Sequence, residues 1–281
     1  MTPERPIRRL DRRWPSASTS VLVLCYHRVG EPPSSPLARY MVSPGRLDSQ
    51  LRQLRERGFR FLDLNGLRRV ILGEDLGGSA ACVTFDDGYL DNLELGVPVL
   101  EAHSCPATFF VVTERVGRTA DWDPLLGDAA LMTWEHLRDL RQAGFGVGSH
   151  TSTHPWLTRL EPEAMQLELR GSRETVEDRL GEPCCGLAYP YGHRDERVVA
   201  AAGAAGYELA FTVKSGFARL HTHPLQVPRC EVSSSDDAWS FPLKVRYGWR
   251  SAELARRLLR RESARGGKPP ARGPGQEGTD A

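Results

Sequence analysis

The stretch CVTFDDGYLDN, residues 82–92, contains the strongest structural signal of this chain. An apolar run ends at two adjacent aspartates, Asp86 and Asp87, and Gly88 follows them directly. Adjacent carboxylates are unfavourable where water is scarce, because each raises the cost of ionising the other. The pair therefore lies either in a solvated Asp-Gly turn or beside a cation that neutralises it.

Short apolar runs alternate with helical patterns along most of the 281 residues. The alternation predicts an α/β fold with a mainly parallel sheet, open or closed into a barrel. The chain is long enough for one large domain with a buried core. The expected strands are residues 21–26, 59–64, 81–85, 107–112, 145–149, 186–189, 207–212 and 225–229, and the expected helices are residues 44–57, 90–103, 134–143, 162–180 and 194–205.

Both ends of the chain differ from the middle in composition. Residues 1–19 are polar and rich in Arg and Pro, and we expect a loose arm there. Residues 263–281 contain no apolar anchor, and we expect a disordered tail. These boundaries leave residues 20–262 as a single domain.

Composition excludes some classes of partner and predicts a location. The formal net charge is +1, and basic and acidic residues are interspersed, so no nucleic-acid surface is indicated. The N-terminal residues lack the apolar stretch of a signal peptide, and no segment is long enough to span a membrane. We therefore expect a cytoplasmic protein with reduced cysteines, with peripheral attachment to the inner membrane as an option. The oligomeric state is not indicated.

Reactive side chains follow the expected strands. In parallel α/β folds the carboxyl ends of the strands meet on one face, where active sites form. His27 follows the first run, the two aspartates follow a later one, and Arg229 ends the last one. Two further groups lie in the same kind of position: His150 with His154, and Pro190 with Tyr191 and Gly192.

The segment GSHTSTHPWL offers two imidazoles in the spacing HxxxH. Together with Asp87, His150 and His154 would form a three-ligand site with open positions, suited to a cation that activates water. Alone, this spacing is more often coincidence than a metal site, but the strand-end Asp-Asp-Gly favours the metal. Zn²⁺ is the expected ion, with Co²⁺, Ni²⁺, Mn²⁺ or Fe²⁺ as alternatives. Pro155 biases His154 towards an extended conformation.

A cation on Asp87 would leave Asp86 ionised beside an activated water, as a base for amide or ester hydrolysis. His27, at a different strand end, is the natural acid for the leaving group. The alternative is that His27 is a structural histidine of the core. His193 is the competing proton donor. Tyr89, Trp122, Trp134 and Trp156 could line a sugar site, although core packing is the default for each.

Three ordered motifs, TFDDGY, SHTSTHP and AYPYG, resemble those of the polysaccharide deacetylases, the NodB-homology carbohydrate esterases. The resemblance extends over roughly residues 20–250. It implies a distorted (β/α) barrel of about seven parallel strands, a divalent metal, often Zn²⁺, and removal of N-acetyl groups from amino sugars. Position by position, it implies Asp86 as base, Asp87, His150 and His154 as metal ligands, and the amide of Tyr191, between Pro190 and Gly192, as an oxyanion donor.

Two departures refine the resemblance. Many members carry an arginine where this chain has Ala188, and Arg229 could supply the missing guanidinium to orient the base. No late Leu-x-x-His motif is present, and the early Tyr26-His27-Arg28 resembles a subgroup acting on exopolysaccharides such as poly-N-acetylglucosamine, with His27 as acid. The predicted function is a metal-dependent N-deacetylase of a polysaccharide, oligosaccharide or lipid-linked glycan. The alternatives are hydrolysis of a small non-sugar amide and a catalytically silent glycan-binding domain.

Overall fold

Seven parallel strands form the central sheet in the order β10-β1-β5-β6-β7-β8-β9. The computed structural model describes residues 19–31, 39–122, 129–238 and 240–248. A further strand, β4, pairs with the first half of β5, and β6 pairs with the second half. The strands are β1 Ser20–Tyr26, β4 Arg60–Leu62, β5 Ser79–Phe85, β6 Ala107–Val111, β7 Gly146–Ser149, β8 Gly186–Ala188, β9 Leu209–Phe211 and β10 Cys230–Glu231, with a separate parallel pair β2 Arg28–Val29 and β3 Met41–Val42.

The sheet curls into a half-barrel, which confirms the predicted fold class and the single domain. One short segment contacts both ends of the series β1 to β9: Val227 bridges to Phe211 of β9, while Cys230 and Glu231, which form β10, pair with β1. The strand predicted over residues 225–229 is wrong. A 3₁₀ turn, Pro224–Gln226, occupies its start, and Pro228 has no N–H to donate to a ladder. Arg229 therefore precedes a strand instead of ending one.

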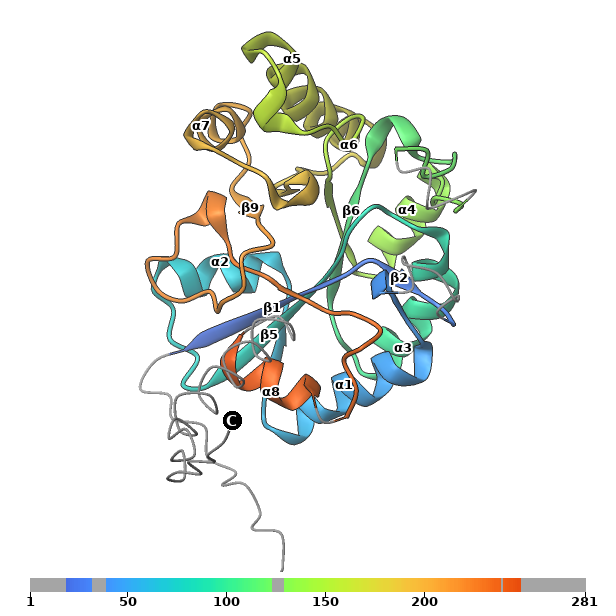
Figure 1. Cartoon of the computed structure of the whole chain (residues 1–281), viewed down its shortest axis with the longest axis vertical. Coiled ribbons are helices and arrows are strands. Elements are labelled where there is room, and N and C mark those ends of the chain that lie inside the picture. The colour runs from blue at the N-terminus through green and yellow to red at the C-terminus, as the bar shows by residue number, and fades with distance from the viewer. Residues whose placement is uncertain (1–18, 32–38, 123–128, 239, 249–281) are drawn as a thin grey trace, which may run out of the picture.

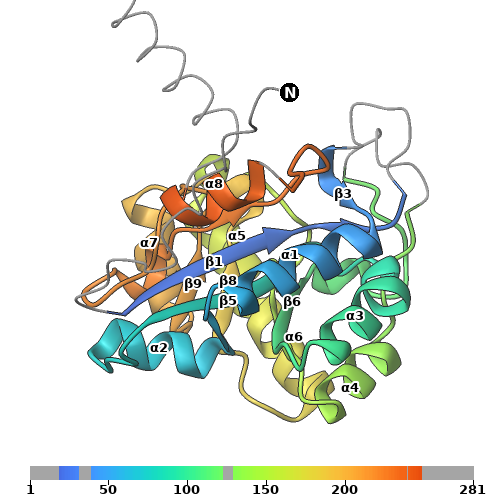
Figure 2. The same ribbon diagram turned by 90° about the horizontal axis from the view of Figure 1, so that it is seen from below.

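All the helices but α2 pack against the outer face of the sheet, in chain order (Figure 1). In the turned view of Figure 2, α1, α3 and α4 follow one another along one flank of the sheet, and α2 lies at its other end. The helices are α1 Pro44–Glu56, α2 Leu64–Leu72, α3 Val97–Ala102, α4 Trp134–Gln142, α5 Pro162–Gln166, α6 Ser172–Leu180, α7 Glu196–Ala204 and α8 Ser240–Tyr247. Shorter turns are the π-helical η2 Asn92–Gly96 and η6 Leu167–Gly171 and the 3₁₀ turns η3 Thr113–Arg115, η5 Leu157–Arg159 and η7 Pro190–Gly192.

The two faces of each strand have different partners, because successive side chains point to opposite sides. On β1, Leu22 and Leu24 pack with the outer helices, whereas Val21 and Val23 pack inside the barrel with α2. On β5, Ala80 and Cys82 also face inward. The same alternation continues the inward row to Asp86 at the mouth of the barrel.

The sequence-based boundaries lie mostly outside the described residues. The expected tail, residues 263–281, and residues 1–18 of the expected arm are not described. Thr19 is described and belongs to the folded domain, since its hydroxyl is 2.5 Å from Asp75 and accepts a bond from the Leu76 amide at 2.6 Å. Among the described residues, no helix is long and apolar enough to cross a membrane.

Candidate active site

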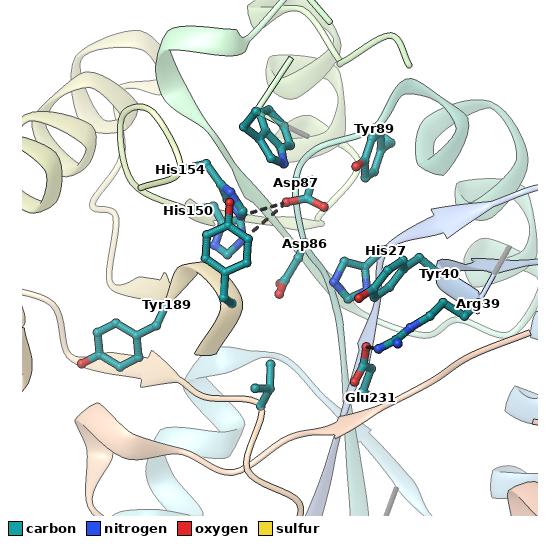
Figure 3. A pocket seen from close by; sticks show the side chains of 13 residues that line it. His27, Arg39, Tyr40, Asp86, Asp87, Tyr89, His150, His154, Tyr189 and Glu231 are labelled. Atoms are coloured by element: carbon teal, nitrogen blue, oxygen red, sulfur yellow. Dashed lines mark ion pairs between the residues drawn. The ribbon is translucent and has the colours of Figure 1, made fainter. Parts of the chain in front are cut away.

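A cavity of about 240 Å³ opens at the carboxyl ends of the strands (Figure 3). Residues that directly follow strands, or end them, supply much of its wall, as the strand-end argument predicts. The lining residues are His27, Arg39, Tyr40, Asp86, Asp87, Tyr89, Trp122, His150, His154, Tyr189, Tyr191, Val213 and Glu231.

Asp87, His150 and His154 converge on one point of this cavity. Asp87 Oδ1 is 3.4 Å from His150 Nε2 and 3.5 Å from His154 Nε2, and all three side chains are buried (Figure 3). Two ligands, each about 2.1 Å from one zinc ion, stand about 3.4 Å apart at the tetrahedral angle. The donor atoms and their separations therefore fit a divalent cation.

Hydrogen bonding and burial leave both imidazoles able to bind a cation. His150 Nδ1 lies 2.7 Å from the Ala188 carbonyl and donates to it, which leaves the Nε2 lone pair facing Asp87. Burial lowers the pKa of His154 to about 3, so this ring is neutral near pH 7.

The cluster as a whole attracts positive charge. Without a cation, burial alone would raise the pKa of Asp87, but a proton on His150 Nε2, hydrogen-bonded to this carboxylate, and the charge of both imidazoles outweigh burial and lower that pKa. Burial would lower the pKa of His150, yet the carboxylates of Asp86 and Asp87 raise it overall. A divalent cation would take the place of the proton that these groups compete to hold.

The site is built on strained backbone. Asp87, Thr151, His154 and Tyr191 have φ of 74°, 69°, 66° and 57°, values that residues with a Cβ rarely adopt. The extended conformation predicted for His154 from Pro155 is therefore wrong. The left-handed turn instead brings the side chain of His154 back to that of His150, with ring centroids 4.8 Å apart.

Asp86 is held by Arg229 in a bidentate ion pair. The guanidinium donates from Nη1 to Oδ1 at 2.7 Å and from Nη2 to Oδ2 at 2.6 Å, and Arg229 is fully buried. Its remaining bonds reach the Thr212 carbonyl at 3.0 Å and the Thr84 hydroxyl at 3.2 Å. Burial would raise the pKa of Asp86, but Arg229 outweighs it and keeps the pKa far below its usual range.

His27 approaches Asp86 from the end of β1. One of its ring nitrogens, Cys25 Sγ and a carboxylate oxygen of Asp86 all lie within 4.8 Å of one another. This second cluster is unsuited to a cation, because Arg229 already occupies both oxygens of Asp86. His27 Nδ1 is buried and has no hydrogen-bond partner among the described residues. Its ring lies against that of Tyr40, with centroids 5.0 Å apart.

The Pro190–Gly192 turn places Tyr191 at the cavity. Gly192 has φ of 70°, and a Cβ there would lie 2.1 Å from Val213, so no other residue fits. The Tyr191 ring stacks on Trp156, with centroids 4.7 Å apart, and meets His154 edge-on at 4.6 Å. The second and third motifs of the sequence are thus joined by packed rings.

Several sequence-based candidates lie elsewhere. His193 stacks on Trp156, with centroids 4.3 Å apart, and does not line the cavity. Trp134 and Trp156 are also absent from the cavity wall, whereas Tyr89 and Trp122 belong to it. Arg179 lies over the Trp134 ring, 5.8 Å from its centroid.

Arg39, Tyr40, Tyr189, Val213 and Glu231 line the cavity and were not predicted. For Glu231 the available signal was its position at a strand end, but that strand was assigned to the wrong residues. Figure 3 shows Arg39 reaching Glu231, with Nη2 3.9 Å from Oε1.

Comparison with known proteins agrees with this geometry. Residues 73–210 match the polysaccharide deacetylase family. YxkH of Bacillus subtilis (strain 168) is 27% identical over 213 residues, 75% of this chain and 71% of that protein. The poly-beta-1,6-N-acetyl-D-glucosamine N-deacetylase of Staphylococcus aureus (strain MRSA252) is 22% identical over 246 residues, 80% of this chain and 82% of that protein.

Solved structures show the same fold. IcaB from Ammonifex degensii superimposes with a TM-score of 0.71 at 28% identity, over 82% of this chain and 97% of that one. The deacetylase PplD from Streptococcus pyogenes, in complex with acetate, shares the fold with a TM-score of 0.68 at 22% identity, over 85% and 98% of the two chains. The curled parallel sheet and its strand-end cluster of carboxylates and imidazoles define a hydrolase of the polysaccharide deacetylase class. This chain belongs to the polysaccharide deacetylase family, as its three motifs predicted.

Proposed function

We propose that this chain is a metal-dependent glycan N-deacetylase, which hydrolyses the acetamide of an N-acetylated amino sugar. The observation that carries the proposal is the pairing, in one cavity, of a three-ligand cluster with a separate carboxylate that Arg229 holds ionised. A binding module would need neither the second carboxylate nor its buried arginine. The names of the relatives in Staphylococcus aureus and Streptococcus pyogenes support a deacetylation.

Asp87, His150 and His154 would hold the cation. When bound, a divalent metal such as Zn²⁺ supplies Lewis acidity, which polarises the amide carbonyl and acidifies water near neutral pH. Asp86 accepts the proton of the attacking water, and Arg229 fixes the plane of its carboxylate. Because both of its oxygens already accept bonds from Arg229, Asp86 has a single preferred orientation.

The leaving amine must be protonated before it can depart. His27 is assigned this role, since a ring nitrogen lies within 4.8 Å of Asp86 and the ring lines the cavity. The backbone N–H of Tyr191 is assigned to the oxyanion, a contribution of about 3–4 kcal/mol in comparable sites. The leaving amine and the oxyanion would therefore each face a donor, His27 or the Tyr191 N–H, whose position is set before substrate binds.

Acetate release from a panel of N-acetylated oligosaccharides, nucleotide sugars and small acetamides tests the proposal. Release from amino sugars that stops with a chelator and returns with Zn²⁺ or Co²⁺ is the expected result. Release from the non-sugar amides alone would assign the amide hydrolase, and glycan binding without release at any metal would assign the silent binding domain. The cytoplasmic location stays a prediction, which cell fractionation tests.

A further inference from the structure

A carboxylate outside the cavity wall holds the loop that carries both histidines. Glu168 lies in η6, the π-helical turn between α5 and α6. Its Oε2 accepts hydrogen bonds from the amides of Ser152 and Thr153, both at 2.9 Å. Its Oε1 accepts the Thr153 hydroxyl at 2.6 Å. The two residues that it binds lie between His150 and His154.

Each backbone amide of residues 150–154 has a hydrogen-bond acceptor, and two of these five amides bond to Glu168. The amide of His150 bonds to the Val111 carbonyl at 2.8 Å, as a continuation of the sheet. The amides of Thr151 and His154 bond to hydroxyls within the loop, at 3.0 and 3.1 Å. The amides of Ser152 and Thr153 bond to Glu168 Oε2. One oxygen atom therefore serves two of the five donors, and its loss leaves both without a partner.

The loop needs such an external anchor because its backbone is strained. Thr151 and His154 have φ of 69° and 66°, a left-handed conformation that is unfavourable for residues with a side chain. The loop carbonyls are held from the other side, where the amides of Thr113 and Glu114 bond to those of Thr151 and Ser152 at 3.1 and 3.0 Å. Glu168 accepts bonds from the loop amides, so the carbonyls and the amides of the loop are both held by residues outside it.

The π-helical turn brings Glu168 to the loop. Its main-chain carbonyl accepts the hydroxyls of Ser172 at 2.6 Å and Ser152 at 3.4 Å, so the helix meets the loop through backbone as well as side chain. π-Helical turns are rare inside α-helices and occur frequently at functional sites. Here the turn interrupts the helix predicted over residues 162–180 at the point of contact with the loop.

We infer that Glu168 is a positioning residue for the metal site, which acts through the amides of Ser152 and Thr153 to keep the imidazoles of His150 and His154 in ligating geometry. The inference rests on the proposed metal site, but the anchoring of the loop can be measured with and without a metal. Removal of an outer hydrogen-bond partner of a metal site typically weakens binding about 10–100-fold.

Three variants separate positioning from general stability. Glu168→Ala removes the three hydrogen bonds from the side chain. Glu168→Gln keeps a carbonyl oxygen for the two amides, and its NH₂ group can donate to the Thr153 hydroxyl. Glu174→Ala is the matched control, because Glu174 lies on α6, is exposed, and loses only a surface pair with Arg170.

The first readout is metal affinity, measured by competition of Zn²⁺ with a chromophoric chelator and by the visible spectrum of the Co²⁺-loaded protein. Glu168→Ala is expected to raise the dissociation constant by about 10-fold or more and to alter the Co²⁺ spectrum. Glu168→Gln is expected to remain within about 3-fold of the parent, and Glu174→Ala to match it. Parental affinity and spectrum in Glu168→Ala would overturn the inference.

The second readout is amide hydrogen exchange over residues 149–156 in metal-free protein. Glu168→Ala should speed exchange of this segment by about 10-fold or more while strands β5 and β6 keep their protection, and Glu168→Gln should not. Equal exchange rates of this segment in Glu168→Ala and the parent would overturn the inference that Glu168 anchors the loop, whether or not the protein binds Zn²⁺. A parent that binds no Zn²⁺ but shows the loop effect would instead overturn the proposed metal-dependent function.

Discussion

Asp86 and Asp87 are neighbours in the chain and both are buried, yet they belong to two different regions of the molecule. Asp86 ends an inward-facing row of side chains in the barrel and is paired with Arg229, a permanent positive charge of the chain itself. Asp87 begins the rim, where its partners are two imidazoles that can exchange a proton for a metal. The left-handed backbone at Asp87 points its side chain in a different direction from that of Asp86. Two identical side chains therefore have different partners and different chemistry.

The largest expected effect lies at the rim. In Asp87→Asn, the metal content and the rate of acetate release should both fall to background, because a neutral amide is a poor ligand in place of a carboxylate. Metal analysis of the purified variant, alongside the activity assay, checks this. A fully metallated, active Asp87→Asn protein would remove Asp87 from the ligand set.

The next effect lies in the barrel interior. Asp86→Asn is expected to keep its metal and lose about 10³–10⁴-fold in kcat, since the amide cannot accept the proton of water. The contrast with Asp87→Asn is the critical result. Equal metal loss in the two variants would show that the two regions are not separate.

His27→Ala should keep its metal and its KM and lose about 10²–10³-fold in kcat, because an amine departs slowly without a proton donor. The matched control is His193→Ala, whose ring stacks on Trp156 away from the cavity and whose loss should change kcat little. A collapse of kcat in His193→Ala with near-normal His27→Ala would transfer the donor role to His193.

Arg229→Ala should change the pH range in which Asp86 can accept a proton. Arg229 lowers the pKa of Asp86, so its removal from this buried site should raise that pKa and move the acid limb of the kcat profile to higher pH. The loss of kcat should be smaller than in Asp86→Asn at high pH, where the carboxylate ionises again. An acid limb at the parental pH would mean that Arg229 does not set the charge of Asp86, and Arg229→Lys, which keeps the charge, is the control.

The same pair makes stability depend on pH. A carboxyl whose pKa is lower in the folded protein than in the unfolded chain, where it is about 3.9, stabilises the fold above that value. The contribution is lost as the pH falls through the folded pKa. Removing Arg229 leaves a buried carboxylate unpaired and should cost about 3–5 kcal/mol of unfolding free energy at neutral pH. Urea unfolding of the parent and the variant at two pH values measures this loss of unfolding free energy. Arg229→Lys should lose less unfolding free energy than Arg229→Ala.

The sequence was informative where function follows the order of strands. Asp87, His150 and His154 each come directly after, or soon after, a parallel strand, and this topology alone brings them to one edge. Arg229 was proposed because an expected arginine was missing, and the structure brings it to Asp86 from the start of β10, not from the end of an earlier strand. A two-residue strand that begins two residues after Pro228 has too little periodicity to be recognised.

Other features depend on contacts that side-chain patterns do not encode. The left-handed turn at His154 contradicts the local preference set by Pro155, so tertiary bonds override it. Glu168 binds backbone amides 15 and 16 residues away, and any sequence offers amides. Arg39 and Tyr40 reach the cavity from the segment before β3, where no strand-end rule applies.

The late position of Arg229 in the chain also determines when its ion pair with Asp86 can form during synthesis. It is 143 residues downstream of Asp86, an interval of roughly 7–30 s at ribosomal rates of about 5–20 residues per second. During that interval the nascent chain already contains β5 but not the guanidinium that neutralises Asp86. A nascent barrel that formed around β5 in that interval would hold Asp86 without its ionic partner, and water would have to take the place of the guanidinium.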